Sequence, residues 1–194
     1  LASLSPKNAS KLFRMPICAW RRKPPACRGG ELVSIFEKSS NAHHLVIVGI
    51  AAFALDQVSK AWAVAVLNET SIEVIWKLRF HLTSNTGFAF STGQNLGPLL
   101  GLLAACIVIL LWRMRARFPS RSGAIALGLV LGGASGNLTD RLFRAPRWGR
   151  GAVVDFIDFR FWPVFNFADA AIVAGVVMLG ATMWIEQRGM RRDA

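Results

Sequence analysis

Three polar blocks in the last third of the chain decide how the sequence folds: GGASGNLTDRL at 132–142, VVDFIDF at 153–159 and FNFADAAI at 165–172. They carry the aspartates Asp140, Asp155, Asp158 and Asp169. The segments that flank these blocks are apolar enough to lie in a membrane, where an ionisable side chain is costly. We therefore take the aspartates as the first candidates for a functional site.

The composition indicates a multi-span membrane protein. The 194 residues are 53% hydrophobic and only 18% charged, which is too apolar for an ordinary soluble domain. Apolar runs predict four transmembrane helices at about 44–67, 96–112, 123–142 and 164–185, close to the roughly 20 residues that cross a bilayer. We predict an all-α membrane protein with a small exoplasmic β or amphipathic segment between the first two helices.

The chain is expected to form one membrane domain, residues 44–187, between two tails. Residues 1–43 are rich in Pro, Ser, Lys and Arg, which predicts a basic, disordered tail, and residues 188–194 form a second, short tail. Lys and Arg are more frequent in the tails and the 113–121 loop than in the opposite loops, which places both termini in the cytoplasm. The same placement beside apolar runs argues against nucleic-acid binding, despite a formal net charge of +12.

The ionisable residues of the predicted helices lie at one depth. At about 1.5 Å per residue, Asp56, Lys60, Asp140 and Asp169 all fall in the outer third of a hydrocarbon core about 30 Å thick. Asp56 and Lys60 are four residues apart, so they can pair on one helix face, either as a structural ion pair or in support of a polar site. We expect one polar site at the outer face of the membrane.

The residues alone leave three functions open. Two aspartates held close in a dry site titrate separately, so that one takes a proton from water while the other donates one; this favours an aspartic hydrolase. Intramembrane carboxylates are also typical of a proton- or ion-coupled transporter, and a structural membrane protein is the third possibility. The aspartates lack HExxH spacing and nearby histidines, and we expect neither a metal nor an organic cofactor.

Five blocks in order resemble the lipoprotein signal peptidase family, also called signal peptidase II. They are DQVSK at 56–60, NTGFAFS at 85–91, GGASGNLTDR at 132–141, VVDF at 153–156 and FNFADAAI at 165–172. Each block alone is weak, but all five in this order are specific. The resemblance implies a four-helix membrane aspartic endopeptidase that cleaves diacylglyceryl-modified prolipoproteins just before the lipidated cysteine and is inhibited by globomycin-type peptides.

The resemblance also implies which residues act. Asp155 and Asp169 take the positions of the catalytic aspartates. The supporting or substrate-binding positions fall on Asp56, Lys60, Asn85, Gly87, Gly133, Asn137, Asp140, Arg141 and Asn166. The enzyme is expected to be a monomer in the bacterial cytoplasmic (inner) membrane, in contact with membrane lipid, with its active site at the outer face.

Two features depart from the family pattern. The linker before Asp155 is longer than expected and adds Arg144, Arg147 and Arg150. Asp158 stands three residues after Asp155 and offers a competing carboxylate. Because Asp155 follows two valines and precedes phenylalanine as in the motif, we expect Asp155 to react and Asp158 to be a solvated loop charge.

Overall fold

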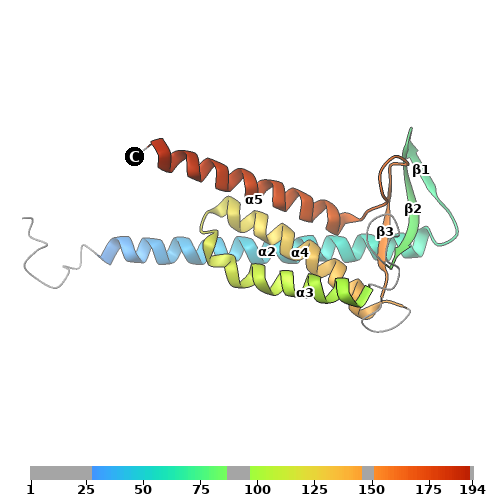
Figure 1. Cartoon of the computed structure of the whole chain (residues 1–194), viewed down its shortest axis with the longest axis horizontal. Coiled ribbons are helices and arrows are strands. Elements are labelled where there is room, and N and C mark those ends of the chain that lie inside the picture. The colour runs from blue at the N-terminus through green and yellow to red at the C-terminus, as the bar shows by residue number, and fades with distance from the viewer. Residues whose placement is uncertain (1–27, 87–96, 146–150, 193–194) are drawn as a thin grey trace, which may run out of the picture. The chain divides into compact units, whose positions relative to one another are not determined.

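The computed structural model describes residues 28–86, 97–145 and 151–192. These residues form the helices α2 (Arg28–Val66), α3 (Gly97–Met114), η4 (Arg115–Arg117), α4 (Arg121–Phe143) and α5 (Phe167–Arg192), and the strands β1 (Ile72–Ile75), β2 (Leu78–Asn85) and β3 (Val153–Asp158) (Figure 1). Asn41–Ala194 form one compact unit, which contains every candidate site residue. Gly87, Arg147 and Arg150 lie outside the described residues.

Three of the described helices are long and apolar enough to cross a membrane, at Asn41–Val66, Pro98–Arg117 and Phe167–Gly189. The predicted third span, α4, is less apolar because glycines interrupt it and because Asn137, Asp140 and Arg141 lie at its end. A mostly helical fold with membrane helices is therefore confirmed, whereas the count of four transmembrane helices stays a prediction.

The first long helix begins earlier than expected. α2 starts at Arg28, inside the segment that was predicted to be a disordered tail. Residues 31–43 contain Glu, Leu, Lys and Ala, which are good helix formers. Residues 28–43 belong to α2, while the division into a tail at 1–43 and a membrane domain at 44–187 stays a prediction.

α4 packs closely against its neighbours because it carries glycines at the contacts. A Cβ atom at Gly132 would overlap the carbonyl oxygen of Gly49 in α2, and one at Gly133 would lie 2.5 Å from the carbonyl oxygen of Ala168 in α5. A Cβ atom at Gly136 would overlap the Asp56 carboxylate. Small residues permit such close helix contacts in membrane proteins. The glycines thus bring the polar end of α4 next to both α2 and α5.

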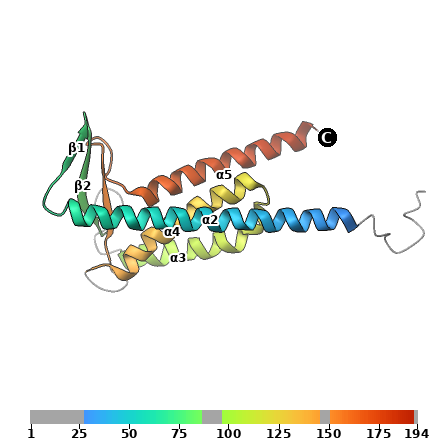
Figure 2. The same ribbon diagram turned by 180° about the vertical axis from the view of Figure 1, so that it is seen from behind.

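A three-stranded antiparallel sheet lies across the ends of these helices, in the order β1-β2-β3 (Figures 1 and 2). The predicted β segment between the first two helices is present as β1 and β2, and β3, from between α4 and α5, completes the sheet. In the β2–β3 ladder Thr83 is paired with Asp155, and Asn85 with Val153. One face of the sheet packs on the end of α2 through Val154 and Phe156. Burial of that face fixes the register, because a slip of one residue would turn it outward.

Candidate active site

Asp169 lies in the first turn of α5, where Asn166 caps the helix. The side-chain oxygen of Asn166 accepts the backbone N–H of Asp169 at 3.0 Å, and the backbone N–H of Asn166 donates to Asp169 Oδ2 at 3.2 Å. This reciprocal pair is a capping box, in which the residue at the cap and the third residue of the helix satisfy each other's N–H groups. The sequence Asn-Phe-Ala-Asp therefore turns the Asp169 carboxylate back toward the start of the helix.

Two amide side chains join Asp169 to Asp155. Asn166 Nδ2 donates to Asp155 Oδ1 at 2.6 Å and to Asn137 Oδ1 at 3.2 Å. Asn137 Nδ2 donates in turn to Asp169 Oδ1 at 2.8 Å. Asp155 is buried in β3, whereas Asp169 is partly exposed. The structure thus brings together four predicted site residues from α4, β3 and α5.

Lys60 fixes the direction of this amide chain. Its side chain is fully buried, and Nζ lies 2.9 Å from Asp56 Oδ2 and 2.8 Å from Asp140 Oδ2. It also donates to Asn137 Oδ1 at 2.8 Å. An ammonium group can only donate, so Asn137 must turn its oxygen toward Lys60 and its NH₂ toward Asp169. The expected Asp56–Lys60 pair is present, and Asp140 joins it from another helix.

The two carboxylates beside Lys60 also hold backbone segments in place. Asp56 Oδ1 accepts the backbone N–H of Ala168 at 3.0 Å, which ties α2 to the first turn of α5. Asp140 accepts Arg144 Nε at 2.6 Å and, at 3.4 Å, the backbone N–H of Val154 in β3. The strand that carries Asp155 and the helix that carries Asp169 are thus each bound to the same buried ion cluster.

Gln57 and Arg141 complete the surroundings of the cluster. Gln57 Nε2 donates to Asp56 Oδ2 at 3.1 Å and to the Gly136 carbonyl oxygen at 3.3 Å; the site prediction omitted it, although it stands within the DQVSK block. The carbonyl oxygen of Arg141 accepts the Gly151 N–H at 2.9 Å, which ties the segment just before β3 to α4. The backbone of Arg141 therefore takes part in holding the segment before β3.

Asn85, at the end of β2, completes the environment of Asp155. Its Nδ2 donates to Asp155 Oδ2 at 3.1 Å, so each Asp155 oxygen accepts a hydrogen bond from a neutral amide. Burial and, next to it, the negative charge of Asp169 raise the pKa of Asp155 to about 6, although the hydrogen bonds from Asn85 and Asn166 oppose the rise. A carboxyl group with this pKa exchanges its proton close to neutral pH.

Asp158 is not the solvated charge that was expected. It is buried, with 4% of its surface exposed. Burial opposes its ionisation, but hydrogen bonds from the backbone N–H of Arg160 at 2.6 Å and from Arg79 Nε at 2.7 Å lower its pKa. The expectation was wrong because the cation that permits burial, Arg79, comes from β2, far away in the sequence. Asp158 therefore stabilises the sheet as an ion pair.

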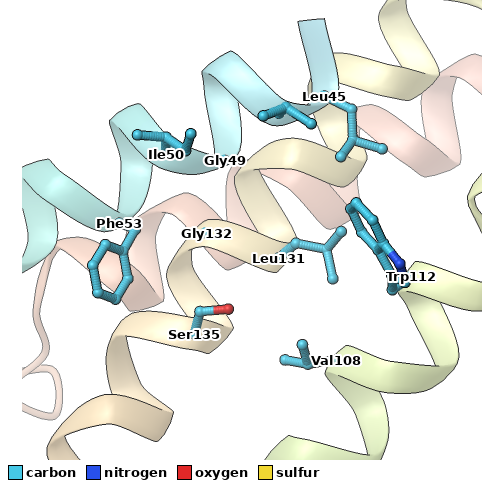
Figure 3. A pocket seen from close by; sticks show the side chains of 10 residues that line it. Leu45, Gly49, Ile50, Phe53, Val108, Trp112, Leu131, Gly132 and Ser135 are labelled. Carbon is cyan, nitrogen blue, oxygen red and sulfur yellow. The ribbon is translucent and has the colours of Figure 1, made fainter. Parts of the chain in front are cut away.

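A pocket of about 320 Å³ lies elsewhere, between α2, α3 and α4 (Figure 3). Leu45, Phe53, Trp112 and Leu131 give it an apolar lining, with Ser135 at one side. None of its lining residues is ionisable, so it offers no acid or base. Among the described residues there is likewise no group of three or more His, Cys, Asp or Glu side chains that would hold a metal ion.

The chain is similar to known proteins in sequence and in fold. A family model described as "Signal peptidase (SPase) II" matches residues 48–185. The lipoprotein signal peptidase of Streptomyces coelicolor is 45% identical over 138 residues, which are 70% of this chain and 67% of that protein. That of Mycobacterium tuberculosis H37Rv is 40% identical over 137 residues, 70% of this chain and 68% of that protein.

A solved structure described as a bacterial membrane enzyme, obtained by the in meso method, is similar with a TM-score of 0.64 at 25% sequence identity. The similarity covers 74% of this chain and 88% of that one. The relatives carry peptidase names, so the alternative of a transporter is not supported. Because the family model and the relatives cover most of the unit that holds the two aspartates, the chain belongs to the signal peptidase II family.

Proposed function

We propose that this peptidase is an aspartic endopeptidase that removes signal peptides from diacylglyceryl-modified prolipoproteins, just before the lipidated cysteine. The observation that carries the proposal is the pair of carboxylates, Asp155 and Asp169, that Asn166 and Asn137 hold together. Related proteins are named lipoprotein signal peptidases, which supports the substrate class. The chemistry requires neither a metal nor an organic cofactor.

In the proposed reaction Asp169 is the base and Asp155 the acid. Asp169 accepts hydrogen bonds from Asn137 and from the backbone N–H of Asn166, and it is partly exposed whereas Asp155 is buried, so water reaches Asp169 more easily. Asp155 is buried and has its pKa raised to about 6, by burial first and then by the charge of Asp169, so it retains a proton longer. Each oxygen of Asp155 accepts one amide N–H and has a second lone pair, so the proton points away from the amides.

In the proposed reaction the two carboxyl groups act as a general base and a general acid. Asp169 takes a proton from water, whose oxygen forms a bond to the scissile carbonyl carbon, while Asp155 gives its proton to the carbonyl oxygen. The resulting tetrahedral diol collapses when the C–N bond breaks. Asp169 then gives its proton to the leaving amine, and Asp155 recovers one from the diol hydroxyl. The partial exposure of Asp169 supports its role as the residue that meets water.

We further propose that α4 is a fourth transmembrane helix and that both termini are cytoplasmic. The close packing of α4 through its glycines supports this assignment, and so does the placement of the buried ions at the sheet end of the helices. The site then lies at the outer face of the bacterial cytoplasmic membrane, in a monomer that globomycin-type peptides inhibit. Lipid on the substrate cysteine would hold the scissile bond at this depth.

The test is cleavage of a lipidated prolipoprotein by the full chain in liposomes. For Asp155→Asn and for Asp169→Asn we expect kcat/KM to fall by about 10³-fold or more, while both variants still accumulate in the membrane. Asp158→Asn, on the same strand, is the matched control and should keep most of the activity. Undiminished cleavage by either of the first two variants would rule out the proposed pair.

A further inference from the structure

The free end of the sheet exposes large apolar side chains. Ile75 and Trp76, at the turn between β1 and β2, are 71% and 83% exposed, and Phe161 and Trp162, after β3, are 67% and 64% exposed. These four residues are called the aromatic tip. They lie outside the candidate membrane spans, where a contiguous apolar surface indicates an interaction site.

Lys77 joins the two halves of the aromatic tip. Its Nζ lies 4.8 Å from the ring centre of Trp76 and 5.9 Å from that of Phe161. An ammonium group is attracted to aromatic faces at such distances. The tip therefore combines exposed aromatic rings with a positive charge.

The backbone at the tip adopts a costly conformation that keeps it outward. Trp76 has a φ of 48° and Arg160 a φ of 64°, in the left-handed region that bulky residues avoid. Packing within the chain gives Trp76 little compensation, because 83% of its surface is exposed. A strained conformation of this kind points to a function that requires the exposed ring.

The sheet that carries the tip lies at the end of the helices where α5, a candidate membrane span, begins (Figure 1). Figures 1 and 2 show β1 and β2 running crosswise to the helices and reaching past the start of α5. α5 itself exposes Val173, Val176 and Val177 along its length, a surface suited to lipid. Trp prefers the boundary between hydrocarbon and headgroups, and a lysine near it keeps its charge at the headgroup level.

We propose that the aromatic tip inserts into the lipid interface beside α5 and anchors the sheet to the membrane. The partner is the bilayer surface. The rings lie at the boundary between acyl chains and headgroups, and Lys77 binds the anionic phosphates. Because the exposed rings and the neighbouring Lys77 supply the two contacts from one surface, the tip binds lipid without a pocket. This contact comes in addition to the membrane-spanning helices.

The anchor would set the height of the proposed catalytic carboxylates, a consequence that rests on the proposed function. β2 runs from Leu78, next to the tip, to Asn85, which donates to Asp155. On the other side, Phe159 contacts Phe161 and stacks on Phe165 with ring centres 5.9 Å apart in each pair. Phe165 stands just before α5. The tip is thus connected to β2, whose Asn85 contacts Asp155, and to the start of α5, which carries Asp169.

A depth measurement tests the anchor without reference to activity. A nitroxide is attached at Ile75→Cys in the full chain, with the native cysteines replaced by alanine, in liposomes of phosphatidylethanolamine and phosphatidylglycerol. We expect the label to be more accessible to oxygen than to a water-soluble nickel complex. Glu69→Cys, exposed in the loop after α2, is the control and should show the reverse. Equal, water-like accessibility at both positions would overturn the proposal.

A second measurement links the anchor to cleavage. Trp76→Gly removes the ring and relieves the left-handed strain, so its thermal stability should equal or exceed that of the wild type. In liposomes we expect kcat/KM to fall roughly tenfold, as is reasonable for loss of part of one aromatic side chain's burial, and Trp76→Phe should restore most of it. Unchanged cleavage by Trp76→Gly would overturn the link. A wild-type chain that does not cleave prolipoprotein would instead contradict the proposed function, and the label's depth would still decide the anchor.

Discussion

Two aspartates on one strand have opposite surroundings. Asp155 and Asp158 are both almost fully buried, at 3% and 4% exposure. Asp155 accepts hydrogen bonds from neutral amides beside another carboxylate, and burial, followed by that second charge, raises its pKa to about 6. Asp158, despite its burial, is paired with Arg79 and has a lowered pKa. Burial alone therefore does not decide whether the pKa of a carboxyl group is raised or lowered; the charge of its partners does.

The largest expected effect comes from removing the ammonium that directs the amides near Asp155. In Lys60→Met the buried carboxylates Asp56 and Asp140 lose their shared cation. Leaving a buried charge without its partner costs about 3–5 kcal/mol of unfolding free energy. Asn137 Oδ1 then loses the Lys60 donor and keeps only Asn166 Nδ2, so the Asn137 NH₂ is held less firmly toward Asp169 and cleavage should fall as well. Thermal unfolding in detergent and a cleavage assay measure the two losses.

Arg144→Met is the matched control for that change. Arg144 also pairs with Asp140, at 2.6 Å, but its side chain is 30% exposed. Solvent screening limits an exposed pair to about 1 kcal/mol or less. If both substitutions lowered stability equally, the buried position of Lys60 would have no special role.

The same substitution at the two aspartates should change stability in opposite directions. The folded pKa of Asp155, about 6, lies above the unfolded value of about 3.9. The folded chain thus binds more protons in this window, and its stability falls as pH rises from about 4 to about 6. Asp155→Asn removes this loss, so we expect a higher melting temperature at pH 7 and a smaller gain at pH 5.

Asp158→Asn should instead lower the melting temperature at pH 7. Its folded pKa is lowered, so its ion pair stabilises the fold above the unfolded pKa, and this contribution is lost as pH falls through the folded value. Differential scanning calorimetry of both variants at pH 7 and 5 makes the comparison. A loss of stability in both at pH 7 would contradict the difference in surroundings.

The smallest expected effect is a shift in the pH profile of cleavage. Asn85 donates to Asp155 and lowers its pKa, so Asn85→Leu should raise that pKa. If Asp155 acts as the acid, the alkaline limb of kcat/KM moves to higher pH, by roughly half a unit to one unit for one hydrogen bond. Thr83→Val, opposite Asp155 in the ladder, should leave the limb in place. If the alkaline limb of kcat/KM moved to lower pH in Asn85→Leu, a group other than Asp155 would be the proton donor.

The sequence predicted the local part of the site better than the distant part. Asp56 and Lys60 are found four residues apart on one helix, and Asn166 with Asp169 follows a capping pattern, so spacing alone indicates both pairs. The link from Lys60 to Asp140 joins segments 80 residues apart in the chain, and no helical period reveals it. The roles of these residues in catalysis stay predictions.

The fold shows the same division between local and distant information. Long apolar runs predicted membrane helices, and the β or amphipathic segment expected between the first two of them is present as β1 and β2. The pairing of β3 with β2 depends on where two distant segments meet. The ion pair between Arg79 and Asp158, which permits Asp158 to be buried, depends on it too. Arg79 also lay outside the predicted site because a charged residue beside a strand is usually solvated.

The glycine contacts of α4 have a mechanical consequence. At Gly128, Gly132 and Gly136 the helix backbone already touches α2 without an intervening Cβ atom. Lateral pressure from the lipid therefore cannot bring the two helices closer, because closely packed atoms are nearly incompressible. Forces that separate the helices would instead lengthen the spacing between Asp56 and Asp140, which Lys60 bridges. Swelling agents such as short-chain alcohols should thus inhibit the enzyme more than a tightly packed bilayer does.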